Sequence, residues 1–444
     1  MLIDDTIVAR ATPPGLGGVA LVRLSGPRAL EITCMITQKK LFQPRVATLS
    51  TLWGKDGEKV DEGLVCVFTA PHSYTGEDVV EISLHGSDVL VGLVVEACLA
   101  NGARMANPGE FTERAFHHGK IDLMQASAVC DLIHARSALA ARAALQSLQG
   151  RFSDQVQLLQ KQLMTLRIYV ESSIDFSEEE VDLLTDQAFL VHLNQLNETL
   201  DTILHQAQSG YVLNRGLRLA IIGPTNVGKS SLMNWLTQMD TSIVTDIAGT
   251  TRDVVKEQVV LNGIPITLVD TAGLRQSNDV VEQHGMARVA QEINQADVIW
   301  LVLDCSRHQP DESVTFWTTH LNDIPYPKDR VTLIMNKVDL GRQFEDVICI
   351  SAKHNIGKQA LLTTLMPEDK ALGADAISVR ASQLDALRRV KASVNDAKVN
   401  INSHQLDLAA EEIKTAQDAL SELTGEVTQE DVLSAIFSTF CIGK

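Results

Sequence analysis

The sequence predicts a multidomain protein of mixed α/β and all-α parts, in which a doubly wound α/β domain interrupts a helical domain. Three observations predict this. Residues 121–208 hold one glycine and no proline, and repeat Leu, Ala and Gln at helical spacing. Helical periodicity returns at 377–423. Between the two stretches, apolar strands alternate with helical patterns, which indicates an α/β domain inserted into one helical bundle.

We expect four segments from these changes. They are an N-terminal α/β domain at 1–119, a first helical part at 120–213, an inserted α/β domain at 214–370 and a second helical part at 371–444. A chain of 444 residues is long enough for about two to four domains, each with its own core.

The N-terminal segment reads as strands and helices separated by many turns. Val19–Leu24 and Gly63–Phe68 are strand-like, and Asp88–Ala100 is helical. Pro13–Gly15 and Asn107–Gly109 carry proline and glycine together, which marks turns. This mixture predicts a small α/β domain.

Start and stop signals divide the helical parts. Ser177–Glu180 is a capping box that predicts a helix start, and Ser209–Gly216 reads as a short linker. Residues 367–375 form a polar connection to the second helical part. Thr428–Asp431 predicts the cap of a last helix, Val432–Phe440.

A phosphate-binding loop is predicted at Gly223–Ser230. It follows the strand-like run Leu217–Ile222 and precedes the helix-prone stretch Ser231–Leu236. Small residues let backbone N–H groups point at an anion, and the helix directs its positive N-terminal end to the same place. We expect Lys229 to reach the β- and γ-phosphates and Ser230 to bind Mg²⁺.

Three more apolar runs, at 264–269, 331–335 and 346–350, each end in polar residues. The first runs into Asp270–Gly273. Ligands of open α/β sheets bind at the carboxyl ends of strands, so the Asp270 carboxylate is expected to hold the Mg²⁺ shell through water. The Gly273 N–H is placed to meet a γ-phosphate.

The other two runs lead to Asn336–Asp339 and Ser351–Lys353. A carboxylate only accepts hydrogen bonds, so Asp339 suits guanine, which donates from its ring N–H and its exocyclic amine on one edge. Adenine lacks that amine, which allows strong discrimination. The Ala352 N–H can donate to the guanine carbonyl oxygen. Together the four motifs predict a Ras-like P-loop GTPase domain; a domain that binds GTP without hydrolysing it is the alternative.

Two details narrow the class of GTPase. Leu274 stands where Ras-like switches carry a glutamine that orients the attacking water, so hydrolysis must take a water-positioning group from elsewhere. A threonine-rich loop, Thr245–Asp253, lies between the phosphate loop and the next strand. Thr251 is expected to bind Mg²⁺, and the carbonyls of the loop can coordinate a second cation.

Composition excludes several other classes. Lys and Arg number 38 against 56 Asp and Glu, a net charge of −18, so generalised attraction to nucleic acid is not expected. Any RNA contact is then local or supplied by a partner. Seven cysteines without a CxxC pair argue against a disulfide framework. The acidic start Met1–Asp5 and the lack of an apolar run near the roughly 20 residues of a membrane span predict a cytoplasmic protein without membrane contact.

Further motifs extend over the whole length: Ala11–Gly15, Tyr74–Asp78, Pro108–Phe111 and Phe440–Lys444. With the nucleotide motifs, they make the chain resemble the MnmE (TrmE) family of tRNA-modification GTPases. The resemblance implies GTP hydrolysis activated by K⁺, an ion that takes the place of an arginine finger worth about 10³ to 10⁵ in rate.

The resemblance places K⁺ at Asn226, Thr245, Ile247 and Thr250, and the water-orienting acid at Glu282. The implied catalytic residues are Lys229, Glu282, Gly249 and Thr250. The expected contacts to GTP come from the phosphate loop (Asn226, Val227, Gly228, Lys229, Ser230, Ser231), the switch loop (Thr245, Asp246, Ile247, Ala248, Gly249, Thr250, Thr251), the Asp270, Thr271, Ala272 and Gly273 motif, and the base site (Asn336, Lys337, Asp339, Ser351, Ala352, Lys353).

Alternatives from the residues themselves stay open. Asn226 can serve only to shape the turn, Glu282 can be a surface acid, and Arg252 or Arg275 can act as an internal finger in place of K⁺.

For the N-terminal domain, the resemblance implies dimerisation and a site for 5,10-methylene- or 5-formyl-tetrahydrofolate. Arg23, Glu81 and Lys120 fall at the family's folate positions, and Lys444 reaches in from the C-terminus. A pterin edge offers donors that suit Glu81, and the glutamyl tail offers carboxylates that suit cations. Solvated surface charges are the alternative. Cys441 can attack a uridine ring as a thiolate, but a structural or ligand-proximal role is favoured.

The implied function is the addition of a carboxymethylaminomethyl or aminomethyl group at C5 of the wobble uridine of certain tRNAs, together with the FAD-dependent partner MnmG in a heterotetramer or larger assembly. Two other functions are considered: a ribosome-assembly switch, and a self-sufficient folate-dependent transferase with a regulatory GTPase domain. The chain has no dinucleotide fingerprint, which disfavours the latter.

Overall fold

The computed structural model describes residues 5–175, 187–238, 256–270, 290–321, 327–365, 375–424, 440 and 443. It forms two compact units, one of residues 1–130, 156–160 and 414–444, the other of residues 131–155 and 161–413. The bounds of the four predicted segments stay a prediction. The two predicted caps, Ser177–Glu180 and Thr428–Asp431, and the last helix up to residue 439, lie outside the described residues.

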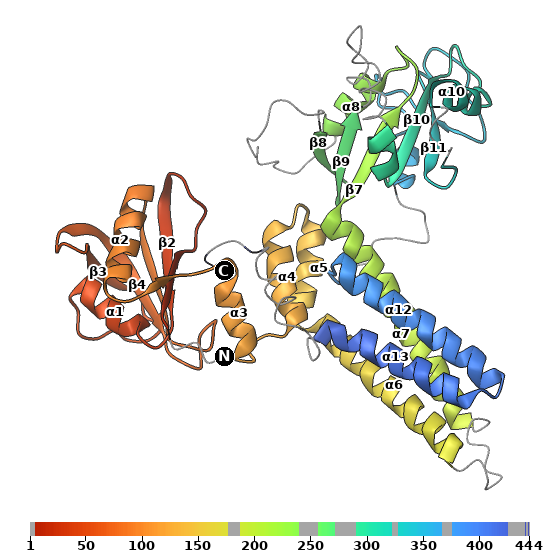
Figure 1. The fold of residues 1–444 in the computed structure, drawn as a ribbon. Coiled ribbons are helices and arrows are strands. Elements are labelled where there is room, and N and C mark those ends of the chain that lie inside the picture. The colour runs from red at the N-terminus through yellow and green to blue at the C-terminus, as the bar shows by residue number, and fades with distance from the viewer. Residues whose placement is uncertain are drawn as a thin grey trace. The chain divides into compact units, whose positions relative to one another are not determined.

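The first unit contains a six-stranded sheet in the order β3-β4-β5-β2-β1-β6 (Figure 1). Neighbouring strands are antiparallel except β1 and β6, which are parallel. The strands are β1 (Ile7–Arg10), β2 (Gly17–Ser25), β3 (Thr48–Trp53), β4 (Lys59–Phe68), β5 (Val79–Gly86) and β6 (Arg104–Met105). Both strands predicted from the sequence of this domain are confirmed, as parts of β2 and β4.

Three helices accompany this sheet: α1 (Ala29–Thr37), α2 (Asp88–Ala100) and α3 (Glu110–His117). The predicted helix at Asp88–Ala100 is confirmed by α2. Side chains alternate across each strand, so Val8 of β1 joins the core beneath α1 and α2, whereas Ile7 joins a second core with Phe111 of α3. Both faces of the sheet are therefore covered near β1.

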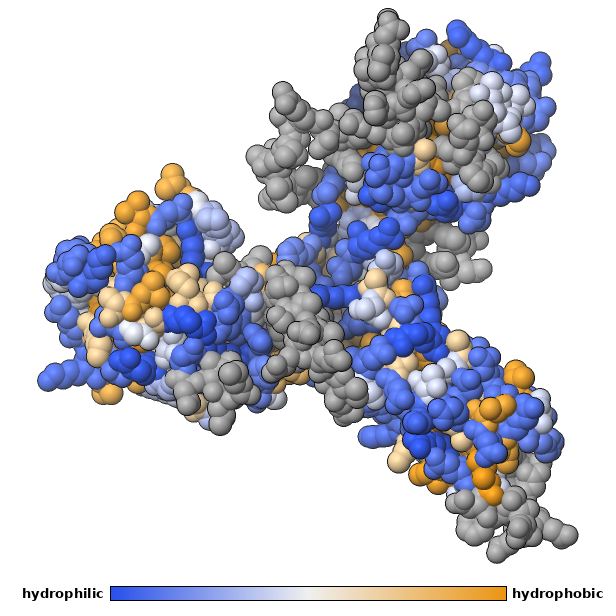
Figure 2. Space-filling model, viewed as in Figure 1, coloured by the Kyte–Doolittle hydropathy of each residue, from blue (hydrophilic) through white to orange (hydrophobic). Residues whose placement is uncertain are grey.

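One end of this domain exposes apolar side chains. Leu16, Val19 and Val89 are 93%, 66% and 70% exposed. They lie together because Gly17 pairs with Gly86 across β2 and β5, just before Val89 in the chain. We call these three residues the apolar patch. Figure 2 shows hydrophobic residues gathered on the visible face of this domain.

The helical parts comprise α4 (Leu123–His134), α5 (Ala138–Leu148), α6 (Arg151–Asp175), α7 (Gln187–Arg215), α12 (Ala381–Asn402) and α13 (Leu406–Thr424). The long helices α7 and α12 pack against each other (Figure 1). None of the helices described is both long enough and apolar enough to cross a lipid bilayer.

The predicted linker Ser209–Gly216 is wrong, because α7 continues to Arg215 and only Gly216 lies outside it. Gly210 is a packing residue. A Cβ atom there would stand 1.8 Å from the carbonyl oxygen of Ile377, so glycine lets a second backbone segment approach the helix.

That second segment corrects another prediction. Helical periodicity was expected from 377, but residues 376–380 are not helical and α12 begins at Ala381. The Ser378 N–H donates to Ala143 O of α5, and the Ser378 Oγ donates to Asp131 of α4. Because its polar groups bond to the neighbouring helices, the segment does not form its own helical turn here.

The inserted domain is a six-stranded sheet in the order β12-β11-β10-β7-β9-β8. All neighbours are parallel except β8 and β9. Its elements are β7 (Leu217–Ile222), α8 (Lys229–Gln238), β8 (Lys256–Leu261), β9 (Ile264–Asp270), β10 (Val298–Asp304), α10 (Glu312–His320), β11 (Val331–Asn336), β12 (Ile348–Cys349) and α11 (Lys358–Thr363). The doubly wound prediction is confirmed.

Apolar runs form this sheet because both of its faces are buried. Leu219 and Ile221 of β7 join one core, and Ala220 and Ile222 join the core on the other face. The predicted strands at 217–222, 264–269 and 331–335 are confirmed. The strand expected at 346–350 is shorter, with only Ile348–Cys349 paired to β11.

Candidate functional site

The predicted phosphate loop Gly223–Ser230 lies between β7 and α8, and its last two residues, Lys229 and Ser230, are the first two residues of α8. Two of its glycines are required by close approaches. Gly223 has φ +150°, and a Cβ there would stand 2.2 Å from Val302 O; Gly228 has φ +97°, and a Cβ would stand 2.4 Å from Asn336 Nδ2. Asn226 also has positive φ, +62°. The loop therefore packs tightly against the neighbouring strand ends and leaves no room for larger side chains at these two positions.

Lys229 is buried and turns back over this loop. Its Nζ donates to Gly223 O at 2.9 Å and to Pro224 O at 2.6 Å. An ammonium held by loop carbonyls is poised above the place where phosphate oxygens bind in loops of this type. Ser230 and Ser231 follow with exposed side chains, so the Ser230 hydroxyl is accessible to a metal ion.

Asn336 joins the phosphate loop to the base-site motif. It ends β11 with a side chain that is only 2% exposed. Its Nδ2 donates to Val227 O at 2.8 Å, and its Oδ1 accepts from the Ala352 N–H at 3.2 Å. One buried amide thus sets the spacing between two loops that come from distant parts of the chain.

Lys337 makes a second link to the phosphate loop. Its Nζ donates to Asn226 O at 2.6 Å and to Asp304 Oδ2 at 2.8 Å. Asp304 ends β10, is buried, and also accepts from Ser306. Burial acts to raise the pKa of Asp304, but the Lys337 ammonium and the Ser306 donors outweigh it and hold the pKa below the usual value. An ionised Asp304 therefore fixes Lys337, which in turn holds the backbone of Asn226.

Asp339 stands at the outer edge of the same site. One oxygen, Oδ1, accepts from the Ser351 hydroxyl, and the other, Oδ2, is 3.5 Å from His354 Nε2. The Ser351 hydrogen bond, with help from the charges of His354 and Lys353, lowers the pKa of Asp339. The carboxylate is therefore ionised and able to accept hydrogen bonds from a base.

The structure brings these predicted residues together at one edge of the sheet. The phosphate loop and Ser351 follow β7 and β12, and Asp270 and Asn336 end β9 and β11. The carboxyl ends of these four strands face the same way because the strands are parallel. Ile221 pairs with Asp270 in the register of β7 and β9. The remaining predicted GTP and cation residues lie outside the described residues, as do the two candidate fingers: Thr245, Asp246, Ile247, Ala248, Gly249, Thr250, Thr251, Arg252, Thr271, Ala272, Gly273, Leu274, Arg275 and Glu282.

In the N-terminal domain, Arg23 and Glu81 form a direct pair across β2 and β5. Arg23 donates from Nε and Nη2 to Glu81 Oε1 at 3.0 and 2.8 Å. Its guanidinium lies 5.7 Å from the ring centres of both Tyr74 and Phe111. The Arg23 Nη1 also donates to Gly443 O at 3.3 Å, so the C-terminal end of the chain reaches this pair.

Lys120 has a different hydrogen-bond partner. Its Nζ donates to Pro71 O at 3.0 Å, and no hydrogen bond or ion pair joins it to Arg23 or Glu81 within the part of the chain that the structure describes. Lys444 and Cys441 lie outside the described residues.

The N-terminal domain also contains a network of ion pairs that the sequence did not predict. Arg114 of α3 is 1% exposed and pairs with Asp5, Glu77 and Glu110. Burial acts to raise the pKa of Glu110, but hydrogen bonds from Arg104, from the Asn107 N–H and from Arg114 outweigh it and lower the pKa. The network ties the start of β1 to α3.

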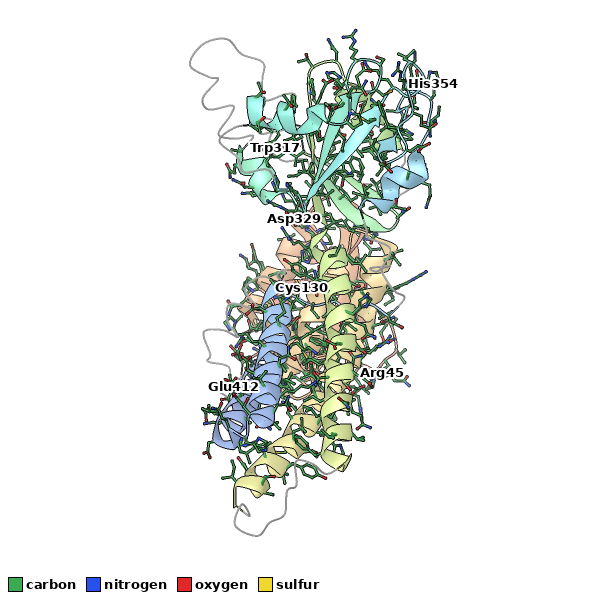
Figure 3. The ribbon with its side chains drawn as sticks, turned by 90° about the vertical axis from the view of Figure 1, so that its right-hand side faces the viewer. Arg45, Cys130, Trp317, Asp329, His354 and Glu412 are labelled. Carbon is green, nitrogen blue, oxygen red and sulfur yellow. The ribbon has the colours of Figure 1, made fainter. Side chains whose placement is uncertain are left out.

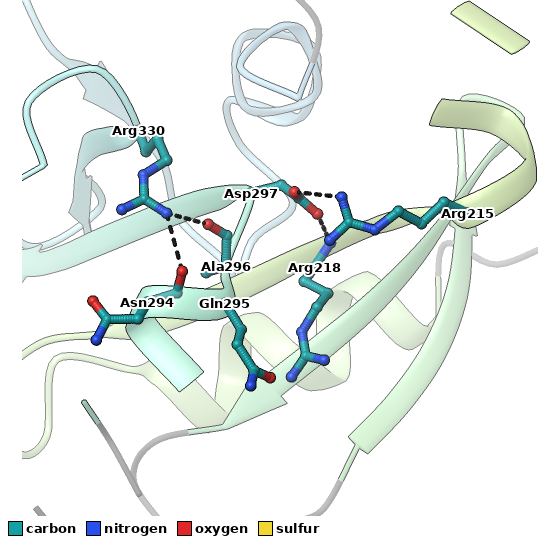
Figure 4. Close-up of a pocket in the computed structure, with 7 residues that line it drawn as sticks. All are labelled: Arg215, Arg218, Asn294, Gln295, Ala296, Asp297 and Arg330. Atoms are coloured by element: carbon teal, nitrogen blue, oxygen red, sulfur yellow. Dashed lines mark hydrogen bonds and ion pairs between the residues drawn. The ribbon is translucent and has the colours of Figure 1, made fainter. Parts of the chain in front are cut away.

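A polar hollow of about 390 Å³ lies at the other end of the inserted sheet (Figure 4). Figure 3 labels Asp329, which precedes β11 on this side, and His354, which lies at the opposite end. In the hollow, Asp297 accepts from Arg215 Nη1 at 3.2 Å and from the Arg218 N–H at 2.9 Å. Since Arg215 ends α7 and only Gly216 separates it from β7, Asp297 braces the connection between helix and sheet.

Three functional candidates were missed by the sequence analysis: Asp304, His354 and Arg114. Asp304 ends an apolar strand, which is the signal that identified Asp270, and so could have been found. His354 and Arg114 carry no such local signal, because their partners are set by a turn and by contacts distant in the chain.

Comparisons with known proteins identify the family of the chain. A family model described as MnmE helical domain matches residues 123–441, and one described as GTP-binding protein TrmE N-terminus matches residues 6–120. The tRNA modification GTPase MnmE of Legionella pneumophila (strain Paris) is 43% identical over 451 residues, with 99% of each chain covered. The protein of the same name from Acinetobacter baumannii (strain AYE) is 42% identical over 456 residues, with the same coverage.

Among solved structures, the G domain of the T. maritima FeoB iron transporter is 25% identical and covers 34% of this chain and 96% of its own, with a TM-score of 0.25. The two family models and the full-length relatives show that the chain belongs to the MnmE (TrmE) family of GTPases.

Proposed function

We propose that the chain is a K⁺-activated GTPase of the cytoplasm that acts with the FAD-dependent partner MnmG. Together the two proteins add a carboxymethylaminomethyl or aminomethyl group at C5 of the wobble uridine of certain tRNAs. The observation that carries the GTPase part is the Asn336 side chain, which joins the phosphate loop to the base-site motif in one buried contact. The tRNA part is supported by full-length likeness to relatives named tRNA modification GTPases.

The geometry around Asn226 supports the proposed K⁺ site. The residue has positive φ and an exposed side chain, and its carbonyl is occupied by the Lys337 ammonium. The side-chain oxygen is therefore the part of Asn226 available to a cation. In the proposal, Thr245, Ile247 and Thr250 supply further oxygens, Ser230 and Thr251 bind Mg²⁺, and Lys229, Gly249, Thr250 and Glu282 serve catalysis.

GTP turnover in K⁺ and Na⁺ buffers of equal ionic strength tests this site. We expect turnover to be faster in K⁺ by orders of magnitude, as for a supplied finger, and Asn226→Ala to abolish the difference. Asn234→Ala, an exposed asparagine of α8, is the matched control and should keep it. Equal turnover in the two salts would remove K⁺ from the mechanism and favour Arg252 or Arg275.

The folate part of the proposal rests on Arg23 and Glu81. Their pair is half-buried against two aromatic rings and touches the C-terminal end, so it offers an acceptor, a cation and flat apolar surfaces in one place. Lys120 and Lys444 are proposed to bind the glutamyl carboxylates. We expect Arg23→Gln to weaken binding of 5-formyl-tetrahydrofolate, measured by calorimetry. Arg45 also lies over an aromatic ring, that of Phe68, but at a different place in the domain. The control variant Arg45→Gln should therefore bind this folate as the wild type does.

The apolar patch supports a homodimer formed through this domain. Leu16 projects almost wholly into solvent at the end of a loop that is held by hydrogen bonds from Arg10 to Gly15 O and from the Gly15 N–H to Asp88. An ordered loop that presents apolar side chains marks an interaction site. We expect Leu16→Asp to give monomers in light scattering, whereas Leu41→Asp, which is 84% exposed outside the patch, should not.

Nucleoside analysis of tRNA from a strain lacking this protein tests the reaction itself. The proposal expects loss of the modified wobble uridine, restored by the wild-type chain but not by one that cannot bind GTP. Intact modification together with accumulated ribosomal subunits would instead indicate a ribosome-assembly switch. One-carbon transfer to tRNA without any flavoprotein would indicate a self-sufficient transferase.

A further inference from the structure

The carboxylate of Asp339 has a neighbour that the nucleotide motifs do not include. His354 Nε2 stands 3.5 Å from Asp339 Oδ2, while Ser351 donates to Oδ1. The Asp339 side chain is 18% exposed, whereas that of His354 is 52% exposed. Both oxygens of the carboxylate therefore already have a polar neighbour in this structure.

A tight turn holds His354 in this place. Ser351 and Ile356 exchange backbone hydrogen bonds of 3.1 Å in both directions. Inside that bridge, the His354 N–H lies 3.2 Å from Ser351 O and 3.3 Å from Ser351 Oγ, and Asn355 has φ +57°. The turn closes on Ser351, the residue that bonds to Asp339, so His354 and Asp339 are held by one connected set of hydrogen bonds.

The charges around the pair define what protonation of His354 would change. Lys353 is exposed next to it and acts on Asp339 as a positive charge. Behind Asp339, on the strand ends, Asp304 is paired with Lys337, and Cys305 is a buried thiol. Among these described groups, the carboxylate of Asp339 is the one that faces the imidazole at close range.

Guanine needs both oxygens of this carboxylate. Its ring N–H and its exocyclic amine donate side by side, and a carboxylate accepts them with one oxygen each. Oδ1 can accept from guanine and Ser351 together, because an oxygen carries two lone pairs. Oδ2 can likewise accept one hydrogen bond from a neutral imidazole and one from the base. A charged imidazolium at this position attracts the carboxylate more strongly than a neutral ring does, and it therefore competes with the base for Oδ2.

We propose that His354 tunes the guanine site, because its protonated ring competes with guanine for Asp339 and nucleotide binding at acid pH therefore expels a proton. The proposal rests on the assignment of Asp339 as the guanine acceptor. His354 is a positioning residue, since it acts through Asp339, and the class of ligand that it affects is guanine nucleotides.

The test is titration of GDP into the full-length chain by calorimetry between about pH 5.5 and pH 8, the range in which histidines change charge. Nucleotide phosphates titrate in the same range, so the result is read as the difference between the wild type and His354→Gln. We expect the affinity of the wild type to fall about two- to fivefold more than that of the variant on acidification, the range of a half-exposed ion pair. At pH 8 the two proteins should bind equally.

Two controls sharpen the result. His205→Gln changes an exposed histidine of α7 and should behave as the wild type. Inosine diphosphate lacks the exocyclic amine and needs one carboxylate oxygen, so the difference caused by His354 should shrink with this ligand. Identical pH profiles for the wild type and His354→Gln would overturn the proposal. Weaker binding by the variant at every pH would also overturn it, since His354 would then contact the base directly.

Failure of the base-site assignment gives a separate outcome. Asp339→Asn is expected to shift preference from guanosine to xanthosine triphosphate, because an acceptor becomes a donor. If that preference does not change, Asp339 is not the acceptor, whatever the pH profile of the His354 variant.

Discussion

Gly210→Ala is a sharp test of how the inserted domain is joined to the helices. Glycine within a helix is normally a weakness, and replacing it with alanine stabilises by about 0.5–1 kcal/mol. At Gly210, however, the added Cβ would stand 1.8 Å from Ile377 O and 2.5 Å from its carbonyl carbon. Both contacts are with backbone, which cannot rotate away, so the two segments must separate by more than about 1 Å, given the usual contact distances.

The cost of such overpacking is about 1–3 kcal/mol, which exceeds the helical gain. Separation also strains the hydrogen bonds that the non-helical segment at 376–380 makes with its neighbours, such as the one from Ser378 to Ala143. We therefore expect Gly210→Ala to destabilise the helical part by about 1–2 kcal/mol, as the balance of these two effects.

Gly92→Ala is the matched control, because Gly92 lies within α2 and a Cβ there would meet nothing within 4 Å. It should stabilise its own domain by about 0.5–1 kcal/mol. Urea unfolding followed by circular dichroism measures the energies, and hydrogen exchange with mass spectrometry assigns them to segments. Faster exchange should be confined to α7 and the segment at 376–380. If Gly210→Ala stabilises the protein as Gly92→Ala does, the close approach of these two segments is wrong.

Three further predictions concern the two sites. Asn336→Ala leaves Val227 O and the Ala352 N–H without their partner, so it should lower domain stability by about 2–4 kcal/mol and weaken GDP binding; unchanged melting and affinity would contradict the bridge. Gly223→Ala adds a Cβ 2.2 Å from backbone at φ +150° and should lower the melting temperature and GDP affinity, whereas a neutral effect would count against the loop geometry. Glu110→Gln should destabilise the N-terminal domain by about 3 kcal/mol at neutral pH, because it breaks a buried ion pair. The folded-state pKa of Glu110 is lowered, so the stabilisation that its charge provides is present above the pKa of the unfolded chain and is lost as pH falls through the folded-state pKa. The unfolding free energies of the wild type and the variant should therefore become equal below about pH 4. A difference that persists there would exclude the charge as the cause.

Much of the nucleotide site could be predicted because its signals are local. An apolar run that ends in Asp270 or Asn336 places that residue at a strand's carboxyl end, and parallel strands bring those ends together. The linker at Ser209–Gly216 failed for a converse reason. From its sequence neighbours alone, a glycine indicates a flexible linker. Gly210 is instead required because the backbone of Ile377, which is distant in the chain, lies against the helix at this point.

The predicted start of a helix at 377 failed in the same manner. Helical periodicity describes which side chains are apolar, and a buried segment that is not helical is apolar too. Its hydrogen bonds with α4, α5 and α7 decided between the two. The Arg114 network could not be predicted, since it joins Asp5 to residues about a hundred positions later.

By itself, the sequence determined where the strands and motifs lie along the chain and the family to which the chain belongs, and it predicts the type of base that Asp339 suits. These follow from short-range patterns, in which residue type and spacing carry the chemistry. The tertiary structure alone decided that Asn336 spans two loops, that Asp304 holds Lys337 against the phosphate loop, and that His354 faces the carboxylate of Asp339. Such contacts depend on strand order and on the closure of a turn, and a residue's own neighbours in the chain do not specify either.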